Sequence, residues 1–287
     1  NRVREIEIAK LRGTKIKQST FMFTLEDGFN IILPFEAKKP EKPRRWEPIP
    51  DGENYFSTGN PDLDKVFSGG YPKGSYIILE ADTNVPLSAI RLFELPLALN
   101  FLAQGRGVAI TPAGGTDSEE IKQLLTPYIG EETFNRLVKI YEEIKPGKDQ
   151  FMPYIALMKG GATNLERDAA AWAQTIINLR EETGKPVLLL QGYDTLESRY
   201  AENLEKLFSE IAADITECKA QGNLILALAR PGLLITQKIL NMIDFHLRLI
   251  ERHGCILFYG VKPRTGIYAV GCDISKGYPR LKLTAMI

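Results

Sequence analysis

The chain has 287 residues, of which 44% are apolar and 25% charged, and its 36 basic residues balance its 36 acidic ones. This length and composition indicate a folded protein with a substantial core, and exclude a disordered or fibrous chain. The charge balance excludes a broad electrostatic attraction to nucleic acid or anionic lipid.

The residue patterns support neither a zinc site nor a membrane span. Cys218, Cys255 and Cys272 are scattered without a C-x-x-C pair, and the chain has only two histidines. Its apolar runs are far shorter than the about 18 residues that a membrane helix needs. We therefore expect reduced thiols, no metal site, no membrane contact and a cytoplasmic location.

Residues 1–34 predict a small antiparallel unit. Polar and apolar residues alternate in 3–8 and 21–25 on either side of a basic turn at 10–17, and Asp27-Gly28 makes a turn before the apolar segment 29–33. The first residue is an asparagine, so we expect a fragment of a longer protein. The apolar side chains of this β-hairpin must pack on something, either the chain's own sheet or a neighbouring unit. The predicted interface residues are Phe21, Phe23, Phe29 and Ile31.

Residues 35–56 predict an extended, solvated linker, because prolines and charged side chains dominate the segment. An alternative is a nucleic-acid patch with a stacking aromatic. Its residues are Lys38, Lys39, Lys42, Arg44, Arg45 and Trp46. Interspersed glutamates dilute this charge, so the linker is the favoured interpretation.

From residue 57 onwards, short apolar strands alternate with amphipathic helices, which predicts a mostly parallel sheet covered by helices on both faces. Strands are expected at 76–80, 107–111, 138–141, 187–190 and 224–229, and helices at 88–103, 118–128, 165–182 and 196–220. Segments 245–250, 255–260 and 266–272 predict antiparallel strands at the C-terminal end.

The start of this region carries a family resemblance. A run of glycines with an apolar-acidic pair precedes the first strand, and it resembles the entry of the KaiC and RadA branch of RecA-like ATPases. Its residues are Gly59, Leu63, Asp64, Gly69, Gly70, Pro72 and Gly74. Segment 6–14, with 21–24 and the Asp27-Gly28 turn, is similar to the hairpin that closes a KaiC-type domain.

The resemblance implies an α/β fold with a RecA-like P-loop NTPase core of the archaeal KaiC/GvpD-like group. It also implies a domain order. Residues 1–34 would be the hairpin tail of an upstream RecA-like unit, 35–56 a linker, and 57–287 a degenerate RecA/KaiC-like domain.

The loop that holds phosphate in this fold, G-x-x-x-x-G-K-[ST], has lost each defining residue here. Glu80 and Val85 stand at the glycines, Pro86 at the lysine and Leu87 at the hydroxyl residue. Proline lacks an N–H, and Glu80 with Asp82 would place negative charge near a triphosphate. We expect affinity for ATP in the usual pose to collapse.

A shifted loop is the remaining route to nucleotide binding. Thr83, Asn84, Ser88 and Arg91 could then hold an anion at the start of the helix, although residues like Ser88 and Arg91 are more often an N-terminal cap and a solvated side chain. ATP with Mg²⁺ would be a cofactor only in that pose.

The two carboxylates that hydrolysis needs are also missing. Pro112 to Ser118 follows the second strand without an acid at the strand end, and Asp117 is predicted to cap the next helix. Gln191 stands at the Walker B position. Asp194 either reaches a metal ion through a bulge or caps the helix beginning near Leu196.

These losses together predict a pseudoenzyme with a regulatory or scaffolding role, partnered by the upstream unit, by copies of itself or by a regulatory protein. Two alternatives stay open: an ATP-binding ATPase or sensor with a non-standard phosphate loop, and a DNA-binding protein related to RecA and RadA.

Overall fold

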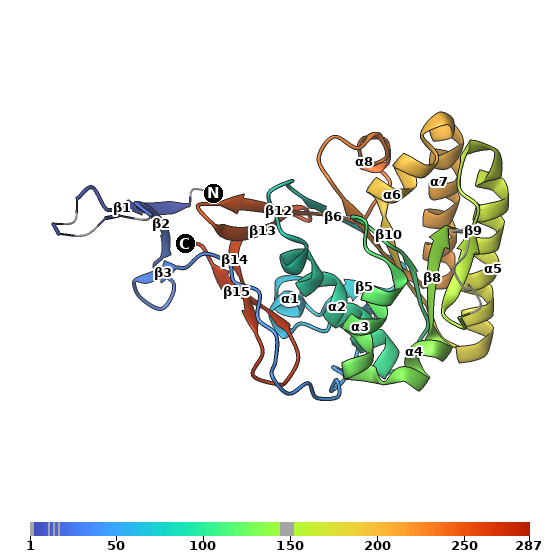
Figure 1. The fold of residues 1–287 in the computed structure, drawn as a ribbon, viewed down its shortest axis with the longest axis horizontal. Coiled ribbons are helices and arrows are strands. Elements are labelled where there is room, and N and C mark those ends of the chain that lie inside the picture. Colours follow the sequence, from blue (N-terminus) through green and yellow to red (C-terminus); the bar gives the residue numbers. More distant parts are fainter. Residues whose placement is uncertain (1–2, 11, 14, 17, 144–151) are drawn as a thin grey trace.

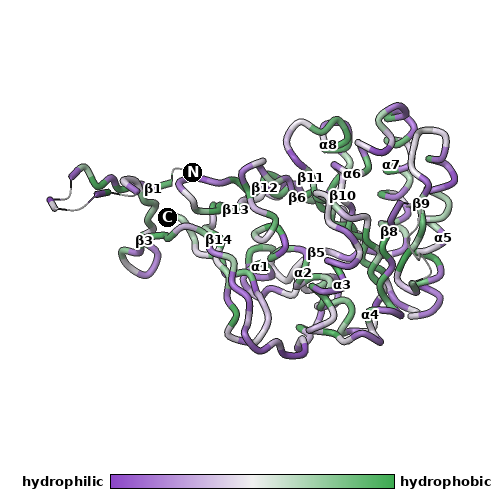
Figure 2. The backbone as a smooth tube through the Cα atoms, viewed as in Figure 1, coloured by the Kyte–Doolittle hydropathy of each residue, from purple (hydrophilic) through white to green (hydrophobic). Residues whose placement is uncertain are grey.

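In a computed structural model, the described residues, 3–143 and 152–287 apart from 11, 14 and 17, form a three-layered α/β body with an extended arm (Figure 1). A ten-stranded sheet has the order β15-β14-β13-β12-β6-β11-β10-β7-β8-β9. Apolar residues concentrate along its central strands (Figure 2). No helix of the described part is long and apolar enough to cross a membrane.

The parallel part of the sheet matches the predicted strands and adds one. Its strands are β6 (Tyr76–Ala81), β7 (Val108–Thr111), β8 (Val138–Glu143), β9 (Ile155–Met158), β10 (Leu188–Gly192) and β11 (Leu224–Ala229). The strands β6, β10 and β11 are buried along their whole length, as expected for strands covered on both faces.

Helices cover both faces of this sheet. On one face lie α1 (Pro61–Val66), α2 (Leu87–Ala103), α3 (Ser118–Ile129) and α4 (Glu131–Leu137). On the other lie α5 (Leu165–Thr183), α6 (Tyr193–Arg199), α7 (Leu204–Gln221) and α8 (Leu234–Ile239). Two short 3₁₀ turns span Ala162–Asn164 and Ala201–Asn203.

The prediction of a single helix over 196–220 is wrong, because the helix is interrupted between α6 and α7. Tyr200 is buried at the break, and its hydroxyl donates to the buried Asp168 at 2.8 Å. Asn203 then leaves the helical region of backbone space before α7 begins. The helical period continues on both sides of the break, so the pattern alone did not reveal it.

The C-terminal strands form an antiparallel meander of β12 (Phe245–Arg252), β13 (Cys255–Lys262), β14 (Ile267–Asp273) and β15 (Arg280–Ala285). The first joins the core, because β12 pairs in parallel with β6 and antiparallel with β13. The sequence did not predict β15, which is the outermost strand at this side of the sheet. Its outer edge is protected, since the amides of Leu281 and Leu283 donate to Asn60 and Asp62 beside α1.

The N-terminal arm is the predicted hairpin with a third strand: β1 (Arg4–Glu7), β2 (Thr20–Thr24) and β3 (Asn30–Ile32). Residues 11, 14 and 17 of the predicted basic turn lie outside the described residues. Met22, on one face of β2, is fully buried against Cys255, Leu257, Ala269 and Met286. The arm therefore docks one face on its own chain's meander, which settles part of the choice that the sequence left open.

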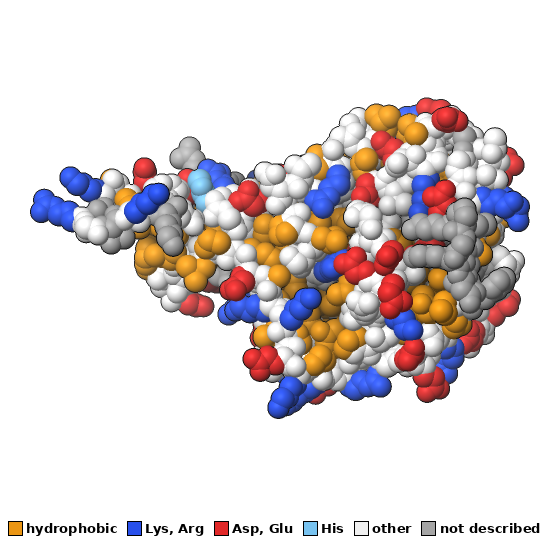
Figure 3. Space-filling view, viewed as in Figure 1, with side chains coloured by type: hydrophobic (Ala, Val, Ile, Leu, Met, Phe, Trp, Pro, Cys, Tyr) orange, Lys and Arg blue, Asp and Glu red, His pale blue; other side chains and the backbone are white. Residues whose placement is uncertain are grey.

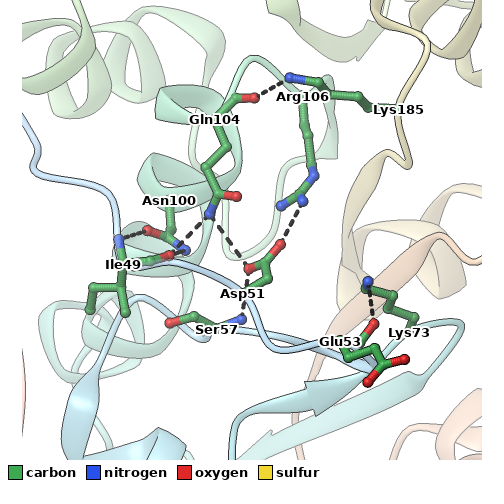
Figure 4. A network of polar contacts seen from close by, with 9 residues as sticks. All are labelled: Ile49, Asp51, Glu53, Ser57, Lys73, Asn100, Gln104, Arg106 and Lys185. Carbon is green, nitrogen blue, oxygen red and sulfur yellow. Dashed lines mark hydrogen bonds and ion pairs between the residues drawn. The ribbon is translucent and has the colours of Figure 1, made fainter.

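Segment 35–56 is extended and mostly exposed, as predicted, but parts of it pack on the helix layer. Trp46 is 6% exposed, and its indole N–H donates to Asn100 on α2 at 3.3 Å. Asp51 then pairs with Arg106 at 2.5 Å and accepts the Ser57 amide at 3.0 Å (Figure 4). The segment is a strap bound to the helix layer. A buried Trp46 cannot stack on a base, which removes the aromatic from the predicted nucleic-acid patch.

The glycine-rich entry motif has a packing role. A short ladder joins β4 (Tyr55–Phe56) to β5 (Tyr71–Pro72) just before β6. At Gly59, φ is +73° and a Cβ would lie 2.3 Å from the carbonyl oxygen of Pro96 in α2. At Gly70, a Cβ would lie 2.1 Å from the carbonyl oxygen of Phe56. These glycines let the entry segment approach α2 and β4 closely.

Candidate functional site

The carboxyl ends of β6, β7, β10 and β11 meet at one edge of the sheet, where ligands bind in open α/β folds. The loop between β6 and α2 lies at this edge, and it is the segment that the sequence aligns with the phosphate loop. This edge is the candidate site, and its charges decide what it can hold.

Glu80, at the end of β6, is paired with two side chains of β12. The sheet register places Arg248 directly beside Glu80. His246 Nε2 lies 2.7 Å from one carboxylate oxygen of Glu80, and Arg248 Nη1 lies 3.4 Å from the other. The His246 hydrogen bond and the Arg248 charge hold the pKa of Glu80 below its ordinary value, against the opposing effect of burial. Arg248 also pairs with Asp82 at 3.0 Å.

The predicted negative charge beside the phosphate position is therefore compensated within the protein. The sequence identified Glu80 and Asp82 but not their partners, which lie more than 160 residues away. The same pairs commit the guanidinium of Arg248, so it is not available as a replacement for the missing lysine.

Arg230 closes the loop from inside. It follows β11, and its Nη1 donates to the carbonyl oxygen of Asp82 at 2.8 Å, with those of Ala81 and Val85 at 3.3 and 3.4 Å. A phosphate loop turns backbone N–H groups toward its ligand. This loop instead turns carbonyl oxygens toward a cation, which is the opposite polarity.

Backbone bonds secure the closed shape of the loop. The Asp82 amide donates to Leu249 of β12 at 2.9 Å, and the Val85 amide donates back to Asp82 at 3.0 Å. Thr83 and Asn84 are exposed at the turn. Ser88 is the second residue of α2 and not its cap, since Pro86 holds the cap position without a side-chain hydrogen bond.

The loop after β7 covers the end of β10. A Cβ at Gly192 would lie 2.5 Å from the Cα of Ala113, so only glycine permits this contact. Asp194 accepts the Gly114 amide at 2.8 Å and the Thr195 amide at 2.8 Å. Asp194 thus tethers the covering loop, and it is the second residue of α6 and not its cap. Asp117 does cap α3, as predicted, by accepting the Glu120 amide at 2.9 Å.

Gln191, at the Walker B position, is 3% exposed and belongs to a buried polar network. Its oxygen accepts the Tyr76 hydroxyl at 2.9 Å, and its amide donates to Asp214 on α7 at 3.3 Å. The hydroxyl of Tyr193 bonds that of Tyr76. The side chain at this position is therefore used in packing the sheet against α7.

A small apolar cavity of about 80 Å³ lies between α2, α3 and the ends of β7 and β10. Arg91 and Glu94 are the charged residues in its wall, and Arg91 pairs with Glu120 of α3 at 2.5 Å. Burial raises the pKa of Glu94 to about 7, and the charge of Asp194 adds to the rise while Arg91 opposes it. Arg91 is thus paired and not freely solvated, and the sequence gave no signal for Glu94.

The site does not fit the nucleotide and metal ion that the RecA fold commonly holds. The lysine and hydroxyl residue are absent, the loop carbonyls face Arg230, and no free carboxylate stands at the end of β10. Within residues 3–143 and 152–287, apart from the three gaps, no group of three or more His, Cys, Asp or Glu side chains could hold a metal ion.

Comparison with known proteins agrees with this fold and identifies the family. Residues 45–287 match the family described as GvpD basic region 2. The chain belongs to this family. It is 26% identical to Protein GvpD2 and 24% identical to Protein GvpD1 of Halobacterium salinarum, with 99% of the chain aligned in each case. The aligned regions are 58% and 62% of those relatives, so the GvpD family chain described here spans less than two thirds of their length.

A solved structure supports the RecA-like fold. A KaiC-like protein from the hyperthermophilic archaeon Pyrococcus horikoshii superposes with a TM-score of 0.56 at 11% identity. The match covers 79% of this chain and 98% of that protein. The predicted KaiC/GvpD-like RecA fold is thereby confirmed for this GvpD family member.

Proposed function

We propose that this chain is a catalytically inactive RecA-like domain of a gas vesicle regulatory protein, and that it acts as a regulatory or scaffolding interaction module. The membership of the GvpD family and the KaiC-like fold support the RecA-like domain. The observation that supports its inactivity is the closed loop between β6 and α2, in which Arg230 occupies the carbonyl oxygens and Arg248 and His246 pair with Glu80.

Opening this loop for a triphosphate would break several bonds at once. Each charge-assisted hydrogen bond contributes on the order of 1.5–3 kcal/mol, and a nucleotide would have to replace them without a lysine. A phosphate bound in the shifted position would meet the exposed turn at Thr83 and Asn84, which has no lysine. These contacts argue against the ATP sensor that the sequence left open.

Isothermal titration of Mg·ATP and Mg·ADP into the protein, together with a thermal-shift scan, tests this proposal. We expect no heat and no rise in melting temperature at millimolar nucleotide, because a ligand of the folded state must raise it by mass action. An active KaiC-like ATPase titrated under the same conditions is the positive control. Micromolar binding of either nucleotide would replace the interaction module by a nucleotide sensor.

The arm supplies the surface for an interaction role. Phe29 and Ile31 are 57% and 47% exposed, and the ring of Phe29 lies 5.1 Å from that of Phe23. Figure 3 shows apolar side chains gathered on the arm. An exposed apolar face of this kind is typical of a binding surface.

A further inference from the structure

The β1–β3 sheet of the arm repeats the β13–β15 meander of the same chain. Both are antiparallel three-stranded units with consecutive strands as neighbours. Lys10-x-Arg12 follows β1 as Lys262-x-Arg264 ends β13, and Gly28-Phe29 follows β2 as Gly277-Tyr278 follows β14. The two turns close alike, since Gly28 donates to Leu25 at 3.2 Å and Gly277 donates to Ile274 at 2.9 Å.

Equivalent faces of the two meanders pack against each other. Met22 on the inner face of the arm contacts Leu257 and Ala269 on the adjoining face of the meander. The opposite face of the C-terminal meander packs on the helix layer. There Phe258 lies 5.1 Å from Phe93 of α2, between ring centroids.

The outer face of the arm has the same apolar pattern but no cover. Ile6 corresponds to Phe258 and Ile31 to Leu283 by strand pairing, and Phe29 follows its turn glycine as Tyr278 does. Exposure separates the two sets: Ile6, Phe29 and Ile31 are 39%, 57% and 47% exposed, whereas Phe258 and Tyr278 are 0% and 3% exposed and Leu283 is partly buried against the core.

The edges of the two meanders differ in the same way. One edge of β13 pairs with β12, which joins the parallel sheet through β6. Within the described part of the chain, β1 pairs with β2 alone, and all four of its residues are exposed. The repeat therefore shows what the arm lacks: a strand at the free edge of β1 and a helix layer over its outer face.

We propose that the arm completes the sheet of a second RecA-like unit in the full-length protein, with Ile6, Phe29 and Ile31 covered by that unit's helices as Phe258, Tyr278 and Leu283 are covered here. The curated relatives are longer than this chain, which aligns with 58% and 62% of their length, so they leave room for a further unit. This inference rests on the proposed interaction role and names its partner. It does not depend on nucleotide binding. If the titration detected bound nucleotide, the inactive-domain proposal would be refuted, but the docking of the arm would still be tested separately.

Thiol labelling in the full-length protein tests the docking. Phe29→Cys places a thiol on the outer face, and Val261→Cys is the matched control, since Val261 is 49% exposed on β13. The labelling rate at each position is followed by peptide-resolved mass spectrometry. We expect the thiol at position 29 to react at least about ten times more slowly than the thiol at position 261, because a buried thiol reacts only after local opening. Equal rates would overturn the proposal.

Two further measurements keep the test decisive. If the covering unit belongs to the same chain, the slow labelling at position 29 should persist when the protein is diluted roughly a hundredfold. If the labelling becomes fast on dilution, the outer face of the arm is covered by a second copy of the protein and the proposal is refuted. Hydrogen exchange of the unmodified full-length protein needs no variant. We expect all four β1 amides to exchange slowly, and rapid exchange of alternate amides would show an open edge and refute it.

Discussion

Removal of the Arg230 guanidinium tests whether this side chain holds the loop between β6 and α2 closed. In Arg230→Met, the loop carbonyls of Ala81, Asp82 and Val85 lose their common donor. Only the 2.8 Å contact to Asp82 has the geometry of a strong bond. A charged hydrogen bond of that kind contributes about 1.5–3 kcal/mol, and partial exposure of Arg230 favours the lower half of this range.

We therefore expect Arg230→Met to lower the free energy of unfolding by about 2 kcal/mol, measured by urea denaturation followed by circular dichroism. The melting temperature should fall by roughly 4–8 °C, since 1 kcal/mol corresponds to about 2–4 °C in a domain of this size.

Lys238→Met is the control, because Lys238 pairs with an exposed Glu205 on the surface. A surface ion pair contributes about 0–1 kcal/mol, so its loss should be small. If the two variants lost equal stability, the closed loop would not depend on Arg230, and the argument for an internally locked site would fail.

Three further predictions concern the charges and the packing around the site. Because the folded-state pKa of Glu80 lies below its ordinary value of 4.5, its contribution to stability is present above that pH and lost as the pH falls through the lowered pKa; Glu80→Gln should flatten the acid limb of a stability–pH curve. Glu94 shows the opposite shift, to about 7, so stability is lost as the pH rises from 4.5 through 7. Glu94→Gln should be more stable than the parent by about 1–3 kcal/mol at pH 8 and nearly equal to it at pH 5, and a constant difference across pH would contradict this. Gly59→Ala forces a Cβ to 2.3 Å from the Pro96 carbonyl oxygen and should cost about 3 kcal/mol or more in thermal unfolding, whereas Gly222→Ala, with φ of +67° and no atom within 4 Å, should cost only about 1 kcal/mol.

Local patterns were sufficient for the core strands and most helices. The apolar runs at 76–80 and 224–229 predicted buried parallel strands because a strand covered on both faces needs apolar side chains at every position. The same patterns did not reveal the break at Tyr200 or the strand β15. Both places contact residues far away in the sequence: Asp168 accepts the Tyr200 hydroxyl, and Asn60 and Asp62 accept amides of β15.

At the candidate site, the sequence determined what is missing, since the absence of the lysine, the hydroxyl residue and the Walker B aspartate can be read from single positions. Only the tertiary structure decided what replaces them. Arg230, His246 and Arg248 follow or belong to strands that pair with β6 across the sheet, and no local spacing relates them to Glu80 or Asp82. Hydrogen bonds and ion pairs between neighbouring strands depend on sheet register, which forms only when the whole chain folds.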